Sequence, residues 1–221
     1  MPVDPWTSHT AYQSTDSTST LAQSFMAKVY RWMSGGLALT GLVAAVVAGF
    51  LPAILQQAAE NPGLRSTLTI AFFALMIGQF IMVVAFSRMV RTSSFGAVAA
   101  MFVAYCAIEG LFFSFVLLSY TGASVASTFF ITGGMFLAMS AYGTLTKSDL
   151  TSWGSFLFMG LFGLIGAGVV VFTGLTAFHT QKIRAFATAG DDRLALNGAL
   201  MLYLDFINLF LSLLRLLGKR R

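Results

Sequence analysis

Long apolar segments separated by short polar ones run along most of the chain. Six such segments can be delimited, at residues 29–51, 68–86, 97–119, 124–142, 154–178 and 194–217. A helix needs about 20 residues to cross the hydrocarbon core of a bilayer, so each segment is long enough to cross it once. The pattern predicts an all-α membrane protein, a polytopic transmembrane helix bundle of about six helices.

Residues 1–24 do not share this pattern. They are rich in serine and threonine and contain few side chains that a core could bury, so we expect a disordered polar tail. The first apolar segment is longer than the core of a signal peptide and is not followed by a convincing cleavage site. The expected organisation is therefore a tail at 1–24 and one transmembrane domain at 25–221.

The composition supports burial in a lipid bilayer. Charged residues make up 10% of the 221 residues and hydrophobic residues 57%, whereas a soluble domain carries about 25% charged residues. The net charge of +5 comes from short clusters between apolar segments, not from a basic stripe with exposed aromatic residues, so nucleic acid is not an expected partner. Cys106 is the only cysteine, which excludes an intrachain disulfide and a paired-thiol metal site.

Cations beside apolar segments usually mark the cytoplasmic side of a membrane. A cytoplasmic N-terminus places the first of them together on that side: Lys28, Arg31, Arg88, Arg91 and Lys147. Segment 154–178 fits one tilted crossing and is too short for two. One crossing would put Lys182, Arg184 and Arg193 outside and return the basic C-terminus to the cytoplasm. Either this loop is exported despite its charge, or one of the last two segments is re-entrant and shielded by protein.

Three ionisable residues lie inside the predicted spans: Glu109, His179 and Asp205. A charge at the centre of a spanning helix costs about 2.5–3.5 kcal/mol, so such a side chain normally faces protein and has a partner. Asp205 has almost only apolar neighbours in YLDFINLF at 203–210. Burial there favours its neutral form, so protonation near neutral pH could reorganise the bundle. The alternative is a structural aspartate that only holds helices together.

The remaining polar candidates are more ambiguous. An unperturbed imidazole titrates near about pH 6.5, so His179 is a candidate proton sensor, although a histidine at a helix end is often a satisfied interfacial residue. Glu109 has Tyr105 one helical turn earlier as a candidate hydrogen-bond partner. Glu109 and Asn208 are candidate pore-lining or polar contact residues.

The sequence lacks the common signatures of enzymes. It contains no His-Glu-x-x-His zinc helix, no Gly-x-Ser-x-Gly elbow and no Walker loop. An intramembrane aspartyl protease would need two carboxylates that share a site, and Asp205 is the only aspartate deep inside a span. We therefore expect neither enzymatic activity nor a cofactor.

Four sequence segments resemble a known family. They are MSAYG at 139–143, TKSDL at 146–150, GLTAFHTQ at 174–181 and YLDFINLF at 203–210. From about Phe25 onward the chain resembles a bacterial member of the Bax inhibitor-1 family, the transmembrane Bax-inhibitor-motif proteins. The resemblance implies about seven helices and a pH-sensitive calcium leak in which two aspartates share a proton and gate the pore. Asp205 matches the second of these aspartates, and Arg88 is the nearest match to an arginine that pairs with them.

Two features of the chain depart from the family pattern. His179 stands where the first aspartate is normally found, so a His179–Asp205 pair is expected in place of the two carboxylates. A cation beside Asp205 would hold it ionised, so the sense or the midpoint of a pH gate would differ. About 25 residues that normally lie between 160–165 and 169–172 are missing, which is one helix by length.

The resemblance also implies where the protein acts and with what. The expected location is the bacterial inner membrane, with several crossings and a cytoplasmic N-terminus, and the expected partners are lipid and calcium ions. Some bacterial relatives resemble modulators of an FtsH-type membrane protease. The alternative function is therefore a non-conducting interaction protein that engages such a protease through residues 1–24.

Overall fold

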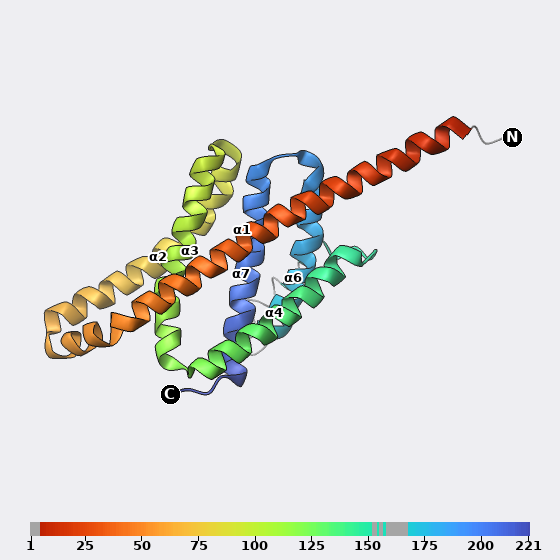
Figure 1. Cartoon of the computed structure of the whole chain (residues 1–221). Helices are drawn as coiled ribbons and strands as arrows, with labels where there is room; N and C mark the ends of the chain where they lie inside the picture. Colours follow the sequence, from red (N-terminus) through yellow and green to blue (C-terminus); the bar gives the residue numbers. More distant parts are fainter. Residues whose placement is uncertain (1–4, 152–153, 155–156, 158–167) are drawn as a thin grey trace.

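The computed structural model describes residues 5–151, 154, 157 and 168–221 of the chain (Figure 1). The helices are α1 (Pro5–Glu60), α2 (Pro62–Thr92), α3 (Phe95–Ser119), α4 (Gly122–Leu145), α6 (Gly168–Ala185) and α7 (Asp192–Leu217), with a 3-10 helix, η1, at Phe186–Ala189. Over these residues no strand forms beyond one isolated bridge, so the predicted all-α class is confirmed. Of the described helices, α1 from Thr20, α2, α3, α4 and α7 are long and apolar enough to cross a membrane.

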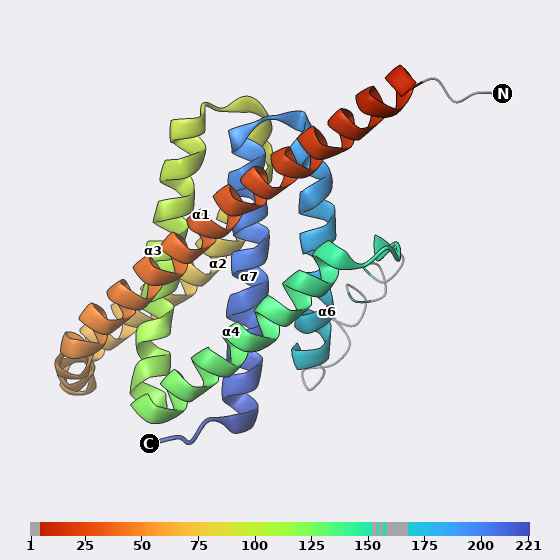
Figure 2. The same ribbon diagram turned by 45° about the vertical axis from the view of Figure 1, so that its right-hand side comes forward.

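The centre of the bundle is α7, which α1, α3, α4 and α6 surround (Figures 1 and 2). Its side chains are buried on several faces, and Leu196, Leu202, Tyr203 and Leu209 have no exposed surface. A helix that is apolar on all sides is stable only where other elements or lipid surround it. The apolar segment at 194–217 therefore forms the core of the bundle.

At the edge of the bundle, α2 has its apolar side chains on the outside. Phe86 and Val90 are its buried residues, whereas Ile70, Phe80 and Ile81 are more than 60% exposed. Large exposed apolar patches are unusual on soluble proteins. In a bilayer these side chains contact acyl chains, so α2 is a lipid-facing helix.

The first helix is much longer than the apolar segment that predicted it. It begins at Pro5 and therefore includes most of the polar segment that we expected to lack secondary structure. In both views this part of α1 extends away from the other helices (Figures 1 and 2). From Thr20 onward, where the exposure of the side chains is described, the first buried residues are Phe25 and Met26. The division of the chain into a tail and a membrane domain near residue 24 stays a prediction.

One end of the bundle gathers cations from three helices, α1, α6 and α7, and we call it the cationic end. Lys28 of α1 lies 2.5 Å from a carboxylate oxygen of Asp192 at the start of α7. Arg193 donates to the carbonyl of Ser93 between α2 and α3, at 3.1 Å, and Arg184 donates to the carbonyl of Thr144 in α4. These contacts place the ends of α2, α4 and α6 beside the start of α7.

The basic C-terminus lies at the opposite end. The N–H of Thr121, between α3 and α4, donates to the carbonyl of Lys219 at 3.0 Å. The N–H of Lys219 donates to the hydroxyl of Ser124 at 2.9 Å. Since α7 runs from Asp192 at the cationic end to Leu217, the cations of 219–221 are separated from the others by the length of that helix.

A tight turn joins the end of η1 to α7. Gly190 has a φ of 65°, a left-handed conformation that glycine adopts without steric cost. Asp191 then caps α7 by accepting a hydrogen bond from the N–H of Arg193 at 2.8 Å. The guanidinium of Arg193 also donates to the carboxylate, and these hydrogen bonds hold the pKa of Asp191 below its usual range. The turn therefore fixes α7 antiparallel to α6.

Of the two explanations left open for segment 154–178, the contacts of its described residues favour the re-entrant one over a single straight crossing. A Cβ atom on Gly154 would lie 2.7 Å from the ring of Phe178, so the two ends of the segment are in contact. A straight helix of this length would separate them by about 37 Å. The N–H of Leu150 also donates to the side chain of Gln181 at 2.9 Å. The chain therefore leaves the cationic end near Leu150 and returns to it through α6.

This arrangement moves the conflict between the charges and the predicted crossings from the connection between α6 and α7 to the C-terminus. Lys182, Arg184 and Arg193 belong to the end of α6 and the start of α7, which lie at the same end of the bundle as Lys28. No cationic loop then has to be exported, but the basic C-terminus, with Lys219, Arg220 and Arg221, lies on the side opposite the other cations. Which end faces the cytoplasm stays a prediction.

We expect a valine at Gly143 to separate α4 from α6. A Cβ atom there would collide with the backbone carbonyl of Ala177, which cannot move as a side chain can. Overpacking of this kind costs about 3 kcal/mol of stability. The measurement is the detergent concentration at which purified protein unfolds. Gly134→Val is the control, because it makes the same change in α4 where nothing lies within 4 Å, and equal losses in the two variants would contradict this packing.

Candidate functional site

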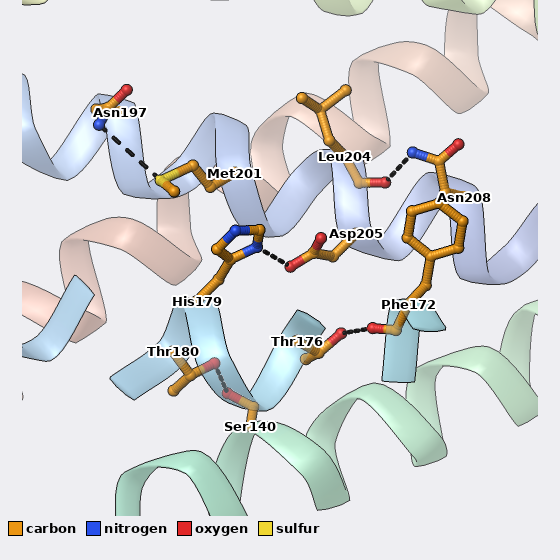
Figure 3. Close-up of polar contacts among 10 residues, drawn as sticks. All are labelled: Ser140, Phe172, Thr176, His179, Thr180, Asn197, Met201, Leu204, Asp205 and Asn208. Carbon is orange, nitrogen blue, oxygen red and sulfur yellow. Dashed lines mark hydrogen bonds and ion pairs between the residues drawn. The ribbon is translucent and has the colours of Figure 1, made fainter. Parts of the chain in front are cut away.

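Two ionisable side chains meet between α6 and α7. The Nδ1 atom of His179 lies 2.7 Å from Oδ2 of Asp205, and the two residues are 8% and 3% exposed (Figure 3). Figure 3 shows the imidazole and the carboxylate pointing toward each other from the two helices. We call this contact the His179–Asp205 pair. The structure thus brings together the two residues that the sequence singled out most strongly.

Small residues allow the two helices to approach closely enough for this contact. A Cβ atom on Gly198 of α7 would lie 2.8 Å from Ile183 of α6, and Gly168 of α6 lies similarly close to Ser212. Small residues at such crossings replace side-chain contacts by close backbone packing. The two glycines lie on either side of the pair, so α6 and α7 are held together above and below it.

Two polar side chains near the pair, Thr176 and Asn208, are occupied within their own helices. Thr176 donates to the carbonyl of Phe172 at 2.8 Å, and Asn208 donates to the carbonyl of Leu204 at 2.8 Å (Figure 3). Serine and threonine often bond in this way to the preceding turn of a helix. Asn208, a candidate polar contact, therefore lies one turn beyond Asp205 and uses its amide nitrogen on its own helix.

The pair can take up or release protons while it holds two helices together. With one proton to share, it is neutral overall, as an imidazolium beside a carboxylate or as their uncharged forms. A further proton leaves an imidazolium beside an uncharged carboxyl, and the loss of the last proton leaves a carboxylate beside a neutral ring. Because charge is costly in a buried site, each change alters the attraction between α6 and α7.

Next to the pair lies a chain of hydroxyl groups that the sequence analysis did not identify. The hydroxyls of Ser140 in α4 and Thr180 in α6 are 3.2 Å apart, and Tyr30 of α1 hydrogen-bonds to Ser140. Thr180 directly follows His179. Ser140 and Thr180 both occur in the segments that carry the family resemblance, which is the one signal that could have found them. The contacts connect the helix of His179 to α1 and α4.

A second buried hydroxyl contact connects α1, α3 and α7. Thr40 donates to the carbonyl of Cys106 at 2.9 Å, and its oxygen lies 2.6 Å from the hydroxyl of Tyr203. Since the proton of Thr40 is used on the carbonyl, the phenol of Tyr203 is the donor in the second bond. Tyr203 lies two residues before Asp205, so this contact fixes the rotation of α7 at the pair.

Glu109 and Arg88 lie away from the pair. Glu109 accepts a hydrogen bond from the side-chain amide of Gln79 in α2 at 2.5 Å. The sequence had offered Tyr105 as the candidate partner of Glu109, and the structure gives Gln79 in its place. Arg88 is exposed near the end of α2, and within the described ranges it forms no ion pair with Asp205. Among all the residues that the structure describes, no three His, Cys, Asp or Glu side chains lie close enough together to hold a metal ion.

The fold and the pair together define a class, the multi-pass α-helical membrane proteins with a buried titratable contact between two core helices. Within this class the chain matches the family described as Inhibitor of apoptosis-promoting Bax1, over residues 22–170 and again over 165–221. Since these matches cover nearly the whole chain, the protein belongs to the Bax inhibitor-1 family.

Relatives from three bacteria are similar to this chain over almost their whole length. Inner membrane protein YbhL of Escherichia coli K12 is 41% identical, over 90% of this chain and 93% of the relative. Protein RP147 of Rickettsia prowazekii is 39% identical, over 89% of this chain and 90% of the relative. A protein of Borreliella burgdorferi is 38% identical, over 91% and 94%.

The comparisons also agree with the expected loss of residues in this chain. The family match is divided into two stretches that meet at residues 165–170, within the region where we expected the gap. The alignment with YbhL runs over 225 positions but takes in 90% of the 221 residues, or about 199. Roughly 26 of its positions therefore have no counterpart in this chain, which is about one helix by length.

Proposed function

We propose that this protein is a non-enzymatic, multi-pass protein of a bacterial inner membrane that conducts calcium as a leak, and that the His179–Asp205 pair is its proton-sensitive gate. The buried contact of 2.7 Å between α6 and the central helix α7 is the observation on which the proposal rests. The location is supported by the name of the relative YbhL, an inner membrane protein. The cationic end would face the cytoplasm, together with the N-terminus.

The proposed gate opens on acidification. In the proposed closed state the pair holds one proton and is neutral overall, so α6 is attracted to α7 without the cost of a buried net charge. A second proton converts the pair to an imidazolium beside an uncharged carboxyl, which removes the attraction and leaves a buried cation. Separation of α6 from α7 then becomes favourable. Two carboxylates would instead carry a net negative charge with one shared proton, so the imidazole changes the charge of the closed state.

Calcium flux into liposomes that contain the purified protein and a trapped calcium dye tests the proposal. Between about pH 8 and pH 5, the range in which an imidazole titrates, we expect flux above that of empty liposomes and a rise as the pH falls. Asp205→Asn should remove most of this pH dependence, because an amide does not take up the proton. Glu60→Gln is the control, since it makes the same chemical change at an exposed position. Absence of flux, or an unchanged pH profile in Asp205→Asn, would contradict the gate.

A second candidate is a non-conducting protein that modulates an FtsH-type membrane protease. It is favoured by the first turns of α1, which extend beyond the bundle and could be reached by another membrane protein (Figure 2). In this case wild-type liposomes would show no flux, and removal of residues 2–24 would reduce co-purification of the protease. The liposome measurement therefore separates the two candidates.

A further inference from the structure

A cavity of about 510 Å³ lies at the cationic end, apart from the His179–Asp205 pair. It is formed by the part of α1 near residue 30 and by the first residues of α3 and α7. The side chains that define its chemistry are Lys28, Arg31, Trp32, Phe95 and Asp192, and Gly35 and Ala195 complete the wall. It therefore combines charged and aromatic groups at one end of a membrane-spanning bundle.

The charges of the cavity leave it net positive. Lys28 is paired with Asp192 at 2.5 Å, and both side chains are about half exposed. Arg31 is exposed and, within the part of the chain that the structure describes, has no hydrogen bond or ion pair. α3 begins at Phe95 and α7 at Asp192, so the positive ends of two helix dipoles also lie beside the cavity. An anion with oxygen acceptors suits Arg31 best, because a guanidinium can donate two parallel hydrogen bonds.

The aromatic wall indicates that the ligand also has an apolar part. Trp32 lies edge to face with Phe95 and with Phe102, with ring centroids 6.0 Å apart in each case. Phe95 remains 41% exposed. Tryptophan beside cations is typical of the level at which lipid headgroups meet acyl chains. A soluble anion would gain nothing from this wall, whereas a lipid would place its glycerol and first methylene groups against it.

We propose that this cavity binds the phosphate group of an anionic phospholipid. Arg31 would bind the phosphate, Lys28 would contribute from its ion pair with Asp192, and Trp32 and Phe95 would contact the start of the acyl chains. The proposal is independent of whether the protein conducts ions, because none of these residues belongs to the gate. It fits the cytoplasmic leaflet, whose anionic lipids attract cations close to the membrane.

Two adjacent glycines show why the cavity stays open. A Cβ atom on Gly36 would collide with Cys106 and Phe102, so Gly36 faces the core. A Cβ atom on Gly35 would meet nothing within 4 Å, and Gly35 lines the cavity. A larger side chain at Gly35 would therefore enter the proposed lipid site from a position where its Cβ atom has open space.

Quenching of Trp32 fluorescence by brominated lipids tests the proposal in the full-length chain. Trp6→Phe and Trp153→Phe leave Trp32 as the only tryptophan. In vesicles that mix phosphatidylglycerol with phosphatidylcholine, we expect brominated phosphatidylglycerol to quench Trp32 more strongly than its share of the lipid accounts for. Arg31→Gln should lower this preference about tenfold, the loss typical of one hydrogen bond to a charged group.

Three controls separate a built site from diffuse surface charge. Arg91→Gln removes an exposed cation from the end of α2, outside the cavity, and should leave the preference unchanged. Gly35→Leu should abolish the preference, whereas Gly49→Leu, also in open space on α1, should retain it. Glycerol 3-phosphate added in excess should not compete.

Four results would overturn the proposal. They are equal quenching by the two lipids in the wild-type chain, equal losses in Arg31→Gln and Arg91→Gln, a preference that survives in Gly35→Leu, and displacement of the lipid by glycerol 3-phosphate. The last result would assign the cavity to a soluble phosphate ester.

Discussion

Replacing His179 with leucine is expected to lower the free energy of unfolding by about 3–5 kcal/mol. The substitution leaves the Asp205 carboxyl at 3% exposure with its ring partner gone, and removal of one partner from a buried pair has a cost of this size. Unfolding in mixed micelles, followed by circular dichroism as the fraction of denaturing detergent rises, measures the change. His9→Leu is the matched control, because His9 is the other histidine and lies in the predicted tail.

Replacing Asp205 with leucine as well is expected to restore most of this loss. Both partners are then apolar, no buried polar group is left unpaired, and such double replacements are often neutral or stabilising. A loss below about 1 kcal/mol in His179→Leu would show that Asp205 does not depend on the ring. A double variant no more stable than His179→Leu would show that the leucines disturb packing instead. Either result would remove the pair as a link between α6 and α7.

The second large effect is expected in the accessibility of single cysteines from the two sides of the membrane. Cysteines placed at Lys28 and at Lys182 should react with an impermeant maleimide from one side, and a cysteine at Lys219 should react from the other. Lys28 and the end of α6 lie at the cationic end, whereas Lys219 contacts the connection between α3 and α4. Cys106→Ala provides the background, since Cys106 is buried and is the only native cysteine.

Intact cells and inverted membrane vesicles supply the two sides for this measurement. If the cationic end faces the cytoplasm, the cysteines at Lys28 and Lys182 should react in inverted vesicles and the cysteine at Lys219 in intact cells. Labelling of Lys182 and Lys219 from the same side would contradict the path of the chain through 150–185. If the cysteines at positions 28 and 182 react in intact cells and the cysteine at 219 reacts in inverted vesicles, the fold is retained and its orientation in the membrane is reversed.

The location of most helices could be predicted, but not their ends. Each of the first four apolar segments lies inside a helix, because burial in lipid requires long apolar stretches with satisfied backbone groups. The segment at 29–51 lies inside a helix that continues to Glu60, and the segment at 68–86 lies inside Pro62–Thr92. Hydrophobicity marks the part of a helix that lipid or protein covers, and it does not register the polar turns beyond.

The path of the chain between α4 and α7 could not be predicted from apolar length. A segment of 25 apolar residues has the same composition whether its ends lie apart or together, and the contact between Gly154 and Phe178 shows that its ends lie together. The clash between cation positions and a single crossing was the useful signal. It identified the segment whose path was in doubt and left two explanations open, of which the re-entrant one fits the contacts.

The site was predictable only where charge made it conspicuous. His179 and Asp205 stood out because ionisable groups are rare in apolar segments, and the structure places them in contact. Thr40 and Tyr203 did not stand out, because a hydroxyl in a helix usually bonds to its own backbone. Their contact across α1 and α7 depends on how each helix is rotated, which a single sequence does not specify.

The return of the chain to the cationic end between Leu150 and Ala185 has a consequence for how such proteins change during evolution. Loss of a helix from a multi-pass protein normally inverts every segment that follows, and the inverted segments then oppose the positive-inside rule. Here the chain leaves and re-enters at one end of the bundle, so residues between these points can be lost while α7 keeps its direction and its pairing with α6. Relatives of different length can therefore share one orientation, and this stretch is where a length change is best tolerated.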